Sequence, residues 1–139
     1  MKNDEDEASP RNRDDPPLRR ALRPSGPVSL NLTESRLPGA TVIRVEGEFD
    51  LLTAPRVAAL LDEVARSRGQ DRVVVDLRAT EFIDSAGLQT LLSVKRRVNR
   101  LGRQLIVVSD AGPVRRMLER SRLIETLGVI AEFDDPPTG

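Results

Sequence analysis

Asp84 and Ser85 are the residues whose types and position are best suited to chemistry. They follow the apolar run Val73–Val75, which predicts a buried strand, and precede leucines at helical spacing, so we expect a helix to begin at or near Ser85. A serine at a helix start commonly caps the helix, by accepting a hydrogen bond from a backbone N–H such as that of Leu88. The same position exposes the hydroxyl, which a kinase can phosphorylate. Asp84 is a second candidate cap, an acceptor that orients the hydroxyl, or only a turn residue.

The composition limits the chemistry that Ser85 can perform. The sequence has no His and no Cys, which excludes a Ser-His-Asp hydrolase, thiolate catalysis, disulfides and Cys-ligated zinc. Neither a G-x-x-x-x-G-K-[ST] phosphate loop nor a G-x-G-x-x-G sequence after a strand occurs. Four acidic residues could pair as acid and base, as in a glycosidase: Glu48, Asp50, Glu81 and Asp84. No Trp or Tyr is present to stack on a sugar, so we expect no enzymatic activity, no cofactor and no metal site.

Positive and negative side chains balance in this chain of 139 residues. Lys plus Arg and Asp plus Glu each number 22, so net charge gives no reason to expect a nucleic acid or an anionic membrane as a direct partner. The sequence has no apolar segment near its N-terminus and no run of about 18 apolar residues, which argues against a signal peptide and a membrane span. We therefore expect a cytoplasmic protein.

The composition also divides the chain into one domain and two tails. Residues 1–27 are rich in Asp, Glu, Arg and Pro and carry few large apolar side chains, so they cannot bury enough surface to offset the entropy of ordering. We predict a disordered N-terminal tail over 1–27, one domain over 28–134 and a C-terminal tail over 135–139. A domain of this length can bury a core built from Leu, Val and Ile.

Hydrophobic periodicity predicts alternating strands and helices in the domain. Thr53, with Pro55 two residues later, marks the start of the first helix, and Ser109 or Asp110 is expected to cap the third. The predicted elements, in chain order, are strands over 28–33 and 41–47, a helix from 53 to about 69, a strand over 73–77, a helix from 85 to about 101, a strand over 105–108, a helix with Pro113 in its first turn, and a short strand over 129–131. The order β-β-α-β-α-β-α-β predicts an α/β fold with a mixed, largely parallel sheet of four to five strands and helices packed on it.

Two segments of the chain resemble the signature of the STAS domain, a family that includes bacterial anti-sigma-factor antagonists and the cytoplasmic domains of sulfate transporters. The first comprises Asp76–Leu77 and the sequence FIDSAGL over Phe82–Leu88. The second is the GEFD loop over Gly47–Asp50, with the helix entered at Thr53. The resemblance runs from about residue 28 to residue 133, and it implies the STAS fold for this part of the chain.

The resemblance implies a function for Ser85. In the antagonists, the serine directly after the motif's aspartate is phosphorylated by a cognate anti-sigma factor with serine-kinase activity, and Ser85 occupies that position. Ala86, where the family often has Ser or Thr, leaves Ser85 as the only hydroxyl in the motif. The unphosphorylated antagonist binds the anti-sigma factor and frees the sigma factor for transcription, as in a stress response. The phosphorylated form does not bind, and a metal-dependent serine/threonine phosphatase resets the switch.

A partner-binding surface around the phosphorylated serine is also implied by the resemblance. Asp50 matches a family position at that surface, and Asp84 matches one that flanks the serine. The implied partner-binding residues are Asp50, Thr53, Asp84, Ser85, Ala86, Gly87 and Leu88.

Two other functions stay open at this point. The chain could be a STAS subunit of a larger assembly, such as a lipid-transport complex or a stress-signalling scaffold, and an extra contact made by residues 1–27 would favour this. A hydrolase would lose turnover on Ser85→Ala, but the absence of His argues against it. We expect the protein to be a monomer.

Overall fold

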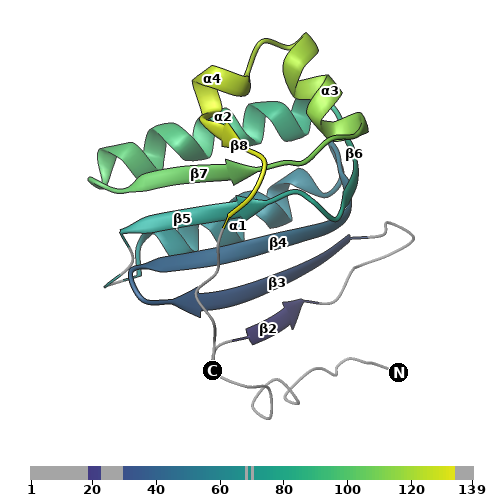
Figure 1. Cartoon of the computed structure of the whole chain (residues 1–139). Helices are drawn as coiled ribbons and strands as arrows, with labels where there is room; N and C mark the ends of the chain where they lie inside the picture. The colour runs from purple at the N-terminus through teal and green to yellow at the C-terminus, as the bar shows by residue number, and fades with distance from the viewer. Residues whose placement is uncertain (1–18, 23–29, 68, 70, 134–139) are drawn as a thin grey trace, which may run out of the picture.

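The structure of the protein, a computed structural model, describes residues 19–22, 30–67, 69 and 71–133. Within these residues a seven-stranded sheet has the strand order β2-β3-β4-β5-β7-β8, and β6 pairs with β4 (Figure 1). The strands are β2 (Arg19–Leu22), β3 (Leu30–Leu37), β4 (Ala40–Phe49), β5 (Arg72–Asp76), β6 (Thr80–Ile83), β7 (Gln104–Val108) and β8 (Val129–Ile130). The helices are α1 (Ala54–Ala65), α2 (Ser85–Arg100), α3 (Pro113–Arg120) and α4 (Ile124–Leu127).

The strand directions confirm the predicted mixed, largely parallel sheet. β2, β3 and β4 pair as antiparallel neighbours, whereas β4, β5, β7 and β8 follow one another in parallel and β6 is parallel to β4. The sheet has more strands than the predicted four to five, because β2 and β6 were not predicted. β2 lies inside the segment 1–27 that we expected to be disordered, and its pairing with β3 corrects that expectation for Arg19–Leu22. The rest of both predicted tails lies outside the described residues.

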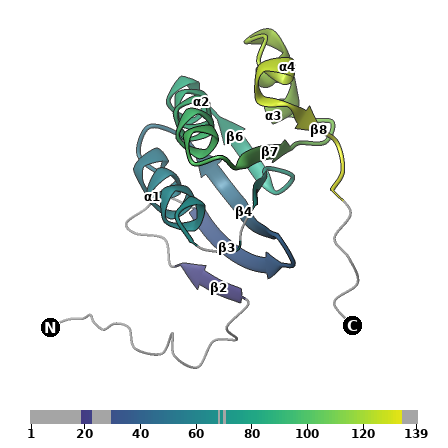
Figure 2. The same ribbon diagram turned by 90° about the vertical axis from the view of Figure 1, so that its left-hand side faces the viewer.

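The two long helices cover one face of the sheet (Figure 2). Both bury the apolar face that helical periodicity predicts. The buried residues are Val57, Leu60, Leu61 and Val64 of α1 and Leu88, Leu91, Val94 and Val98 of α2. They join the inward side chains of the central strands in the main core.

In the described part of the chain, neither these helices nor the shorter ones have the length and apolar character that crossing a membrane requires.

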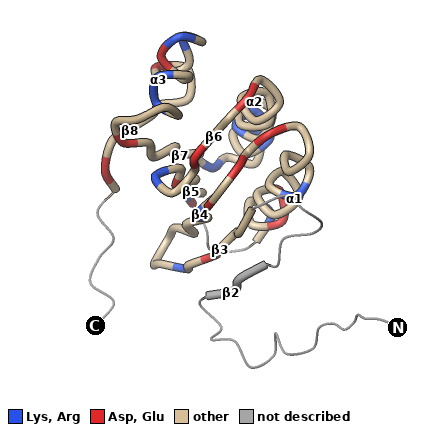
Figure 3. Tube along the Cα trace, turned by 90° about the vertical axis from the view of Figure 1, so that its right-hand side faces the viewer, with Lys and Arg blue, Asp and Glu red and all other residues tan. Residues whose placement is uncertain are grey.

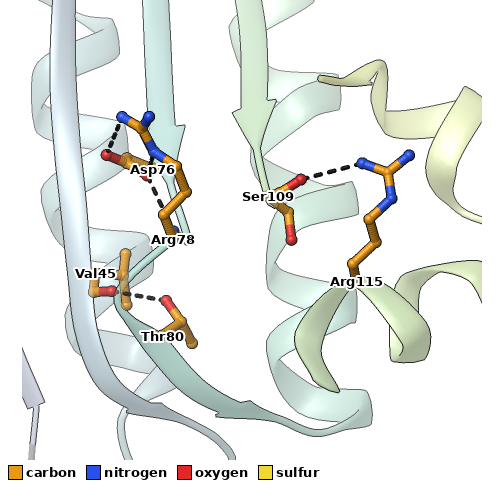
Figure 4. A network of polar contacts seen from close by, with 6 residues as sticks. All are labelled: Val45, Asp76, Arg78, Thr80, Ser109 and Arg115. Atoms are coloured by element: carbon orange, nitrogen blue, oxygen red, sulfur yellow. Dashed lines mark hydrogen bonds and ion pairs between the residues drawn. The ribbon is translucent and has the colours of Figure 1, made fainter. Parts of the chain in front are cut away.

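The third helix begins later than predicted. The N-cap residue of α3 is Gly112, not Ser109 or Asp110. Ser109 is 1% exposed, and its backbone extends the strand contacts. Its N–H donates to the carbonyl of Ile130 at 2.9 Å. Its carbonyl accepts from the Arg115 guanidinium at 3.1 Å (Figure 4). The short helix α4, which follows α3, was not predicted.

Hydrogen bonds fix the turn that leads from β5 to β6 (Figure 4). The Asp76 carboxylate accepts the backbone N–H of Arg78 at 3.0 Å and two bonds from the Arg78 guanidinium at 2.9 and 3.0 Å. The Thr80 hydroxyl donates to the carbonyl of Val45 at 2.7 Å. Burial acts to raise the pKa of Asp76, but the hydrogen bonds and charge of Arg78, with the charge of Arg44, outweigh it and lower that pKa below its usual value. The turn thereby holds β6 against the end of β4.

Candidate partner-binding site

Asp84 and Ser85 have different roles at the N-terminus of α2. Asp84 has an extended backbone (φ −113°, ψ −172°), and its Oδ1 accepts a hydrogen bond from the N–H of Gly87 at 3.0 Å. Asp84 is therefore the N-cap, and the prediction that Ser85 caps the helix is wrong. Ser85 is the first residue of the helix and its side chain is exposed. The hydroxyl is accessible to another protein.

The second oxygen of Asp84 joins α2 to a loop far away in the sequence. Oδ2 accepts the N–H of Leu51 at 3.1 Å, and the N–H of Asp84 donates to the carbonyl of Phe49 at 3.3 Å. Leu51 belongs to the loop between β4 and α1, 33 residues before Asp84. Since one carboxylate holds both segments, the two parts of the sequence signature meet at this residue.

Asp50 and Thr53 close the loop between β4 and α1. Asp50 Oδ1 accepts the N–H groups of Leu52 and Thr53 at 3.0 and 3.1 Å. Thr53 Oγ1 accepts the N–H of Asp50 at 2.9 Å and donates to the carbonyl of Glu48 at 2.8 Å. Thr53 is the N-cap residue of α1, as predicted, but its hydroxyl bonds the loop instead of a helix N–H. It is 1% exposed, so in this structure Thr53 shapes the loop and offers no surface to a partner.

Gly87 allows α2 to lie directly against the sheet. A Cβ atom at this position would be 2.7 Å from Cγ1 of Ile83 and 2.7 Å from the carbonyl oxygen of Phe49. Any larger residue would therefore push α2 away from β4 and β6. Leu88 is buried in the main core. Both residues position Ser85, and their contact with a partner stays a prediction.

The accessible part of the predicted surface consists of Asp50, Asp84, Ser85 and Ala86. The structure adds three exposed apolar side chains beside them. Leu51 is 71% exposed, Leu52 is 70% exposed and Phe82 is 49% exposed. The Leu51 backbone is bonded to Asp84, and Phe82 precedes Asp84 by two residues in β6.

Sequence reasoning missed Leu51 and Leu52 as surface residues. A pair of leucines between Asp50 and Thr53 has no periodicity that assigns it to the core or to the surface. The available signal was their position in a loop between a strand and a helix cap. Neighbouring exposed apolar side chains indicate an interaction surface more strongly than isolated ones do.

Acidic residues surround this accessible surface. Glu48 in β4 and Glu81 in β6 are exposed, and Asp50 and Asp84 are partly exposed. Figure 3 shows the acidic residues along these two strands, which pair in parallel where Glu48 faces Phe82. A negative charge added at this surface would therefore meet like charges. Among the described residues, no cluster of three or more acidic side chains could hold a metal ion.

Comparison with known proteins identifies the family. The family model of the STAS domain matches residues 31–135, and the chain belongs to the STAS domain family. It is 30% identical over 102 residues to the anti-sigma F factor antagonist of Paenibacillus polymyxa, covering 73% of this chain and 87% of that protein. It is 29% identical over 115 residues to the anti-sigma-F factor antagonist RsfB of Mycobacterium tuberculosis, covering 83% of this chain and 93% of that protein.

A solved structure agrees with this assignment. The crystal structure of an anti-sigma factor antagonist from Mycobacterium paratuberculosis matches this fold with a TM-score of 0.71 at 28% identity. The match covers 80% of this chain and 93% of that one. The family and the fold predicted from the sequence are thus confirmed.

Proposed function

We propose that this protein is an anti-sigma-factor antagonist that is switched off by phosphorylation of Ser85. The observation that carries the proposal is the exposed side chain of Ser85 at the first residue of α2, beside a loop held by Asp84. The relatives from Paenibacillus and Mycobacterium, which are named as antagonists, support it. The partner is an anti-sigma factor that binds this surface and phosphorylates Ser85. A serine/threonine phosphatase removes the phosphate.

In the unphosphorylated form, apolar side chains supply much of the binding free energy. Leu51, Leu52 and Phe82 are exposed, and the burial of apolar surface is the main favourable contribution to most protein–protein association. The loop that carries the two leucines is already held by the hydrogen bonds of Asp50 and Asp84. Binding therefore orders little additional backbone, which lowers the entropic cost of association.

Phosphorylation changes the charge where the partner docks. A phosphate adds about −1.5 to −2 charges. The N-terminus of α2 favours an anion because of its dipole and its free N–H groups, so the helix persists. The charge lies next to Asp84 and beside the acidic residues of β4 and β6, and desolvating it against a partner costs free energy. A loss of about 2.8 kcal/mol lowers the affinity about a hundredfold.

The test combines modification with binding. The protein is incubated with its cognate anti-sigma factor and ATP, and the phosphate is located by mass spectrometry. We expect one phosphate on Ser85 and none in Ser85→Ala. Ser93→Ala is the matched control, because Ser93 lies later on α2 and is only partly exposed, and it should be modified like the wild type.

Binding of Ser85→Asp to the same anti-sigma factor completes the test. We expect its affinity to fall at least tenfold, since it places a permanent negative charge at this position. An unmodified Ser85 together with unchanged binding of Ser85→Asp would overturn the proposal. Capture of transporter or scaffold subunits instead of an anti-sigma factor from native lysate would favour a STAS subunit of a larger assembly.

A further inference from the structure

A pocket of about 340 Å³ lies between α1 and α2, at the end of α2 that is far from Ser85. It is called the arginine pocket below, and its lining residues are Asp62, Ala65, Arg66, Arg97, Arg100 and Leu101. On α2, the lining residues Arg97 and Arg100 follow Ser85 by 12 and 15 residues. At 1.5 Å per residue, the pocket is about 18 to 23 Å from the proposed phosphorylation site. The proposed switch makes no use of this end of the molecule.

The arginine pocket carries an excess of positive charge. Its lining has three arginines and one aspartate, so its net charge is +2. Arg97 is paired with Asp62, with 2.9 Å between Nε and Oδ1. Within the described part of the chain, no hydrogen bond or ion pair engages the side chains of Arg66 and Arg100. Two guanidinium groups are therefore available to an anion.

Hydrogen bonds fix the backbone around these two arginines, and one apolar side chain lies in the pocket lining. The Arg103 guanidinium donates to the carbonyls of Ala65 and Ser67, which satisfies the C-terminal end of α1. Leu101, the residue directly after α2, lines the pocket and is 50% exposed. Arg66 and Arg100 also lie at the C-terminal ends of α1 and α2, where cations complement the helix dipole. Guanidinium groups present forked N–H donors that match carboxylates, so Arg66 and Arg100 suit an acidic peptide.

The chain's own sequence contains such a peptide. Asp4-Glu5-Asp6-Glu7 is a run of four acidic residues that lies outside the described residues. The chain enters β2 at Arg19, which pairs with Ser35 near the hairpin between β3 and β4. The carbonyl of Gly39 in that hairpin accepts the N–H groups of Asp71 and Arg72 at the start of β5.

These contacts place the start of β2 at the same end of the sheet as the arginine pocket. Figure 1 shows the hairpin, the start of β5 and the end of α2 together at that end. From β2 to β5 there are three strand spacings, about 14 Å. The 12 residues from Glu7 to Arg19 can span up to about 40 Å. The acidic run is long enough to reach the pocket.

We propose that the arginine pocket binds the carboxylates of the chain's own segment Asp4–Glu7. The interaction is intramolecular, so the effective concentration of the segment is of order millimolar and a weak contact is sufficient. It is electrostatic and exposed, so salt weakens it. The pocket lies at the end of α2 opposite Ser85, so the proposal does not rest on the phosphorylation of Ser85.

A spin label on the full-length chain tests the proposal. The sequence has no Cys, so Asn3→Cys provides one attachment site, directly before Asp4. With a nitroxide there, paramagnetic relaxation should remove more than half of the amide signal intensity of Arg66, Arg100 and Leu101 at low ionic strength. The signals should recover at about 1 M salt, where the screening length is about 3 Å.

Charge variants of the labelled chain distinguish the pocket from general attraction. Arg66→Gln with Arg100→Gln should abolish the broadening, as should replacement of Asp4–Glu7 by their amides. Arg116→Gln, at an exposed arginine of α3, is the matched control and should keep it. All these arginines are exposed, so a dispersed amide spectrum is expected for each variant.

Two results would overturn the proposal. One is the absence of broadening at low ionic strength in the otherwise unchanged chain. The other is broadening that persists undiminished in the double arginine variant while its spectrum stays dispersed. In the first case, binding of a separate synthetic peptide of residues 1–10 would show that the pocket accepts an acidic peptide but not the attached segment.

Discussion

The two oxygens of the Asp84 carboxylate each hold a different part of the molecule. Oδ1 accepts the N–H of Gly87 in α2, and Oδ2 accepts the N–H of Leu51 in the loop after β4. Ser85, the neighbouring residue, has an exposed side chain and does not cap the helix. At the scale of single residues, Asp84 therefore supports the structure, and the adjacent Ser85 carries the proposed phosphorylation.

The first prediction tests this separation. Asp84→Ala removes the cap and the loop contact, and we expect it to lower the free energy of unfolding by about 1 to 2 kcal/mol. Ser85→Ala should change it by less than about 0.5 kcal/mol. Urea unfolding followed by circular dichroism measures both, with Asp84→Asn as the control that keeps a capping side chain. Equal destabilisation by Asp84→Ala and Ser85→Ala would contradict this division of roles.

The second prediction concerns the pH dependence of stability. The pKa of Asp76 in the folded protein is below its usual value, so the folded state binds this proton more weakly than the unfolded state does. Asp76 therefore contributes stability that is fully present above about pH 4 and is lost as the pH falls through the folded pKa. The difference in unfolding free energy between wild type and Asp76→Asn should be largest near pH 6 and should shrink below about pH 4.

The exposed Asp71 supplies the control for this experiment. Asp71→Asn, a surface substitution, should change the free energy of unfolding at pH 6 by less than about 0.5 kcal/mol. A difference between wild type and Asp76→Asn that grows as the pH falls from 6 to 3 would contradict the lowered pKa.

The sequence identified Asp84 and Ser85 but could not decide which of them caps α2. Aspartate and serine are both strong N-cap residues. The backbone decides, because the N–H of Asp84 donates to the carbonyl of Phe49 and this contact fixes where the helix begins. Thr53 was similarly placed at a helix start, but its burial depends on tertiary contacts that the local sequence does not contain.

At the scale of elements, the position of α2 depends on the absence of a side chain at Gly87. The third prediction is that Gly87→Ala destabilises the protein by about 1 to 3 kcal/mol, because the new Cβ would overlap Ile83 and the backbone of Phe49. This outcome runs against helix propensity, which favours Ala over Gly by about 1 kcal/mol. Thermal unfolding measures it, with Gln89→Ala on the exposed side of α2 as the control. A higher melting temperature for Gly87→Ala would show that α2 does not pack against the sheet in this way.

The predictability of each element follows its length and burial. α1 and α2 were predicted because each buries one side at helical spacing, and β5 and β7 because they are continuous apolar runs. β6 has four residues with its two central ones exposed, so it has neither alternation nor an apolar run. β2 begins with Arg19-Arg20, and only its pairing with β3 makes it a strand.

At the scale of the whole molecule, α2 separates an acidic end with exposed leucines from an end that is rich in arginine. The fourth prediction uses this polarity. Leu52→Ala should weaken binding of the anti-sigma factor about tenfold, and Leu101→Ala should not, although both side chains are at least half exposed. Isothermal titration calorimetry measures both affinities. Equal effects of the two substitutions would show that the partner does not recognise the loop between β4 and α1.

The most direct test of the central claim compares two forms of the same protein. The unmodified protein and the protein phosphorylated on Ser85 are each titrated with the cognate anti-sigma factor by calorimetry. We predict that phosphorylation raises the dissociation constant about a hundredfold, corresponding to about 2.8 kcal/mol, while the amide spectrum of the free protein changes only near Ser85. Equal dissociation constants for the two forms would contradict the account.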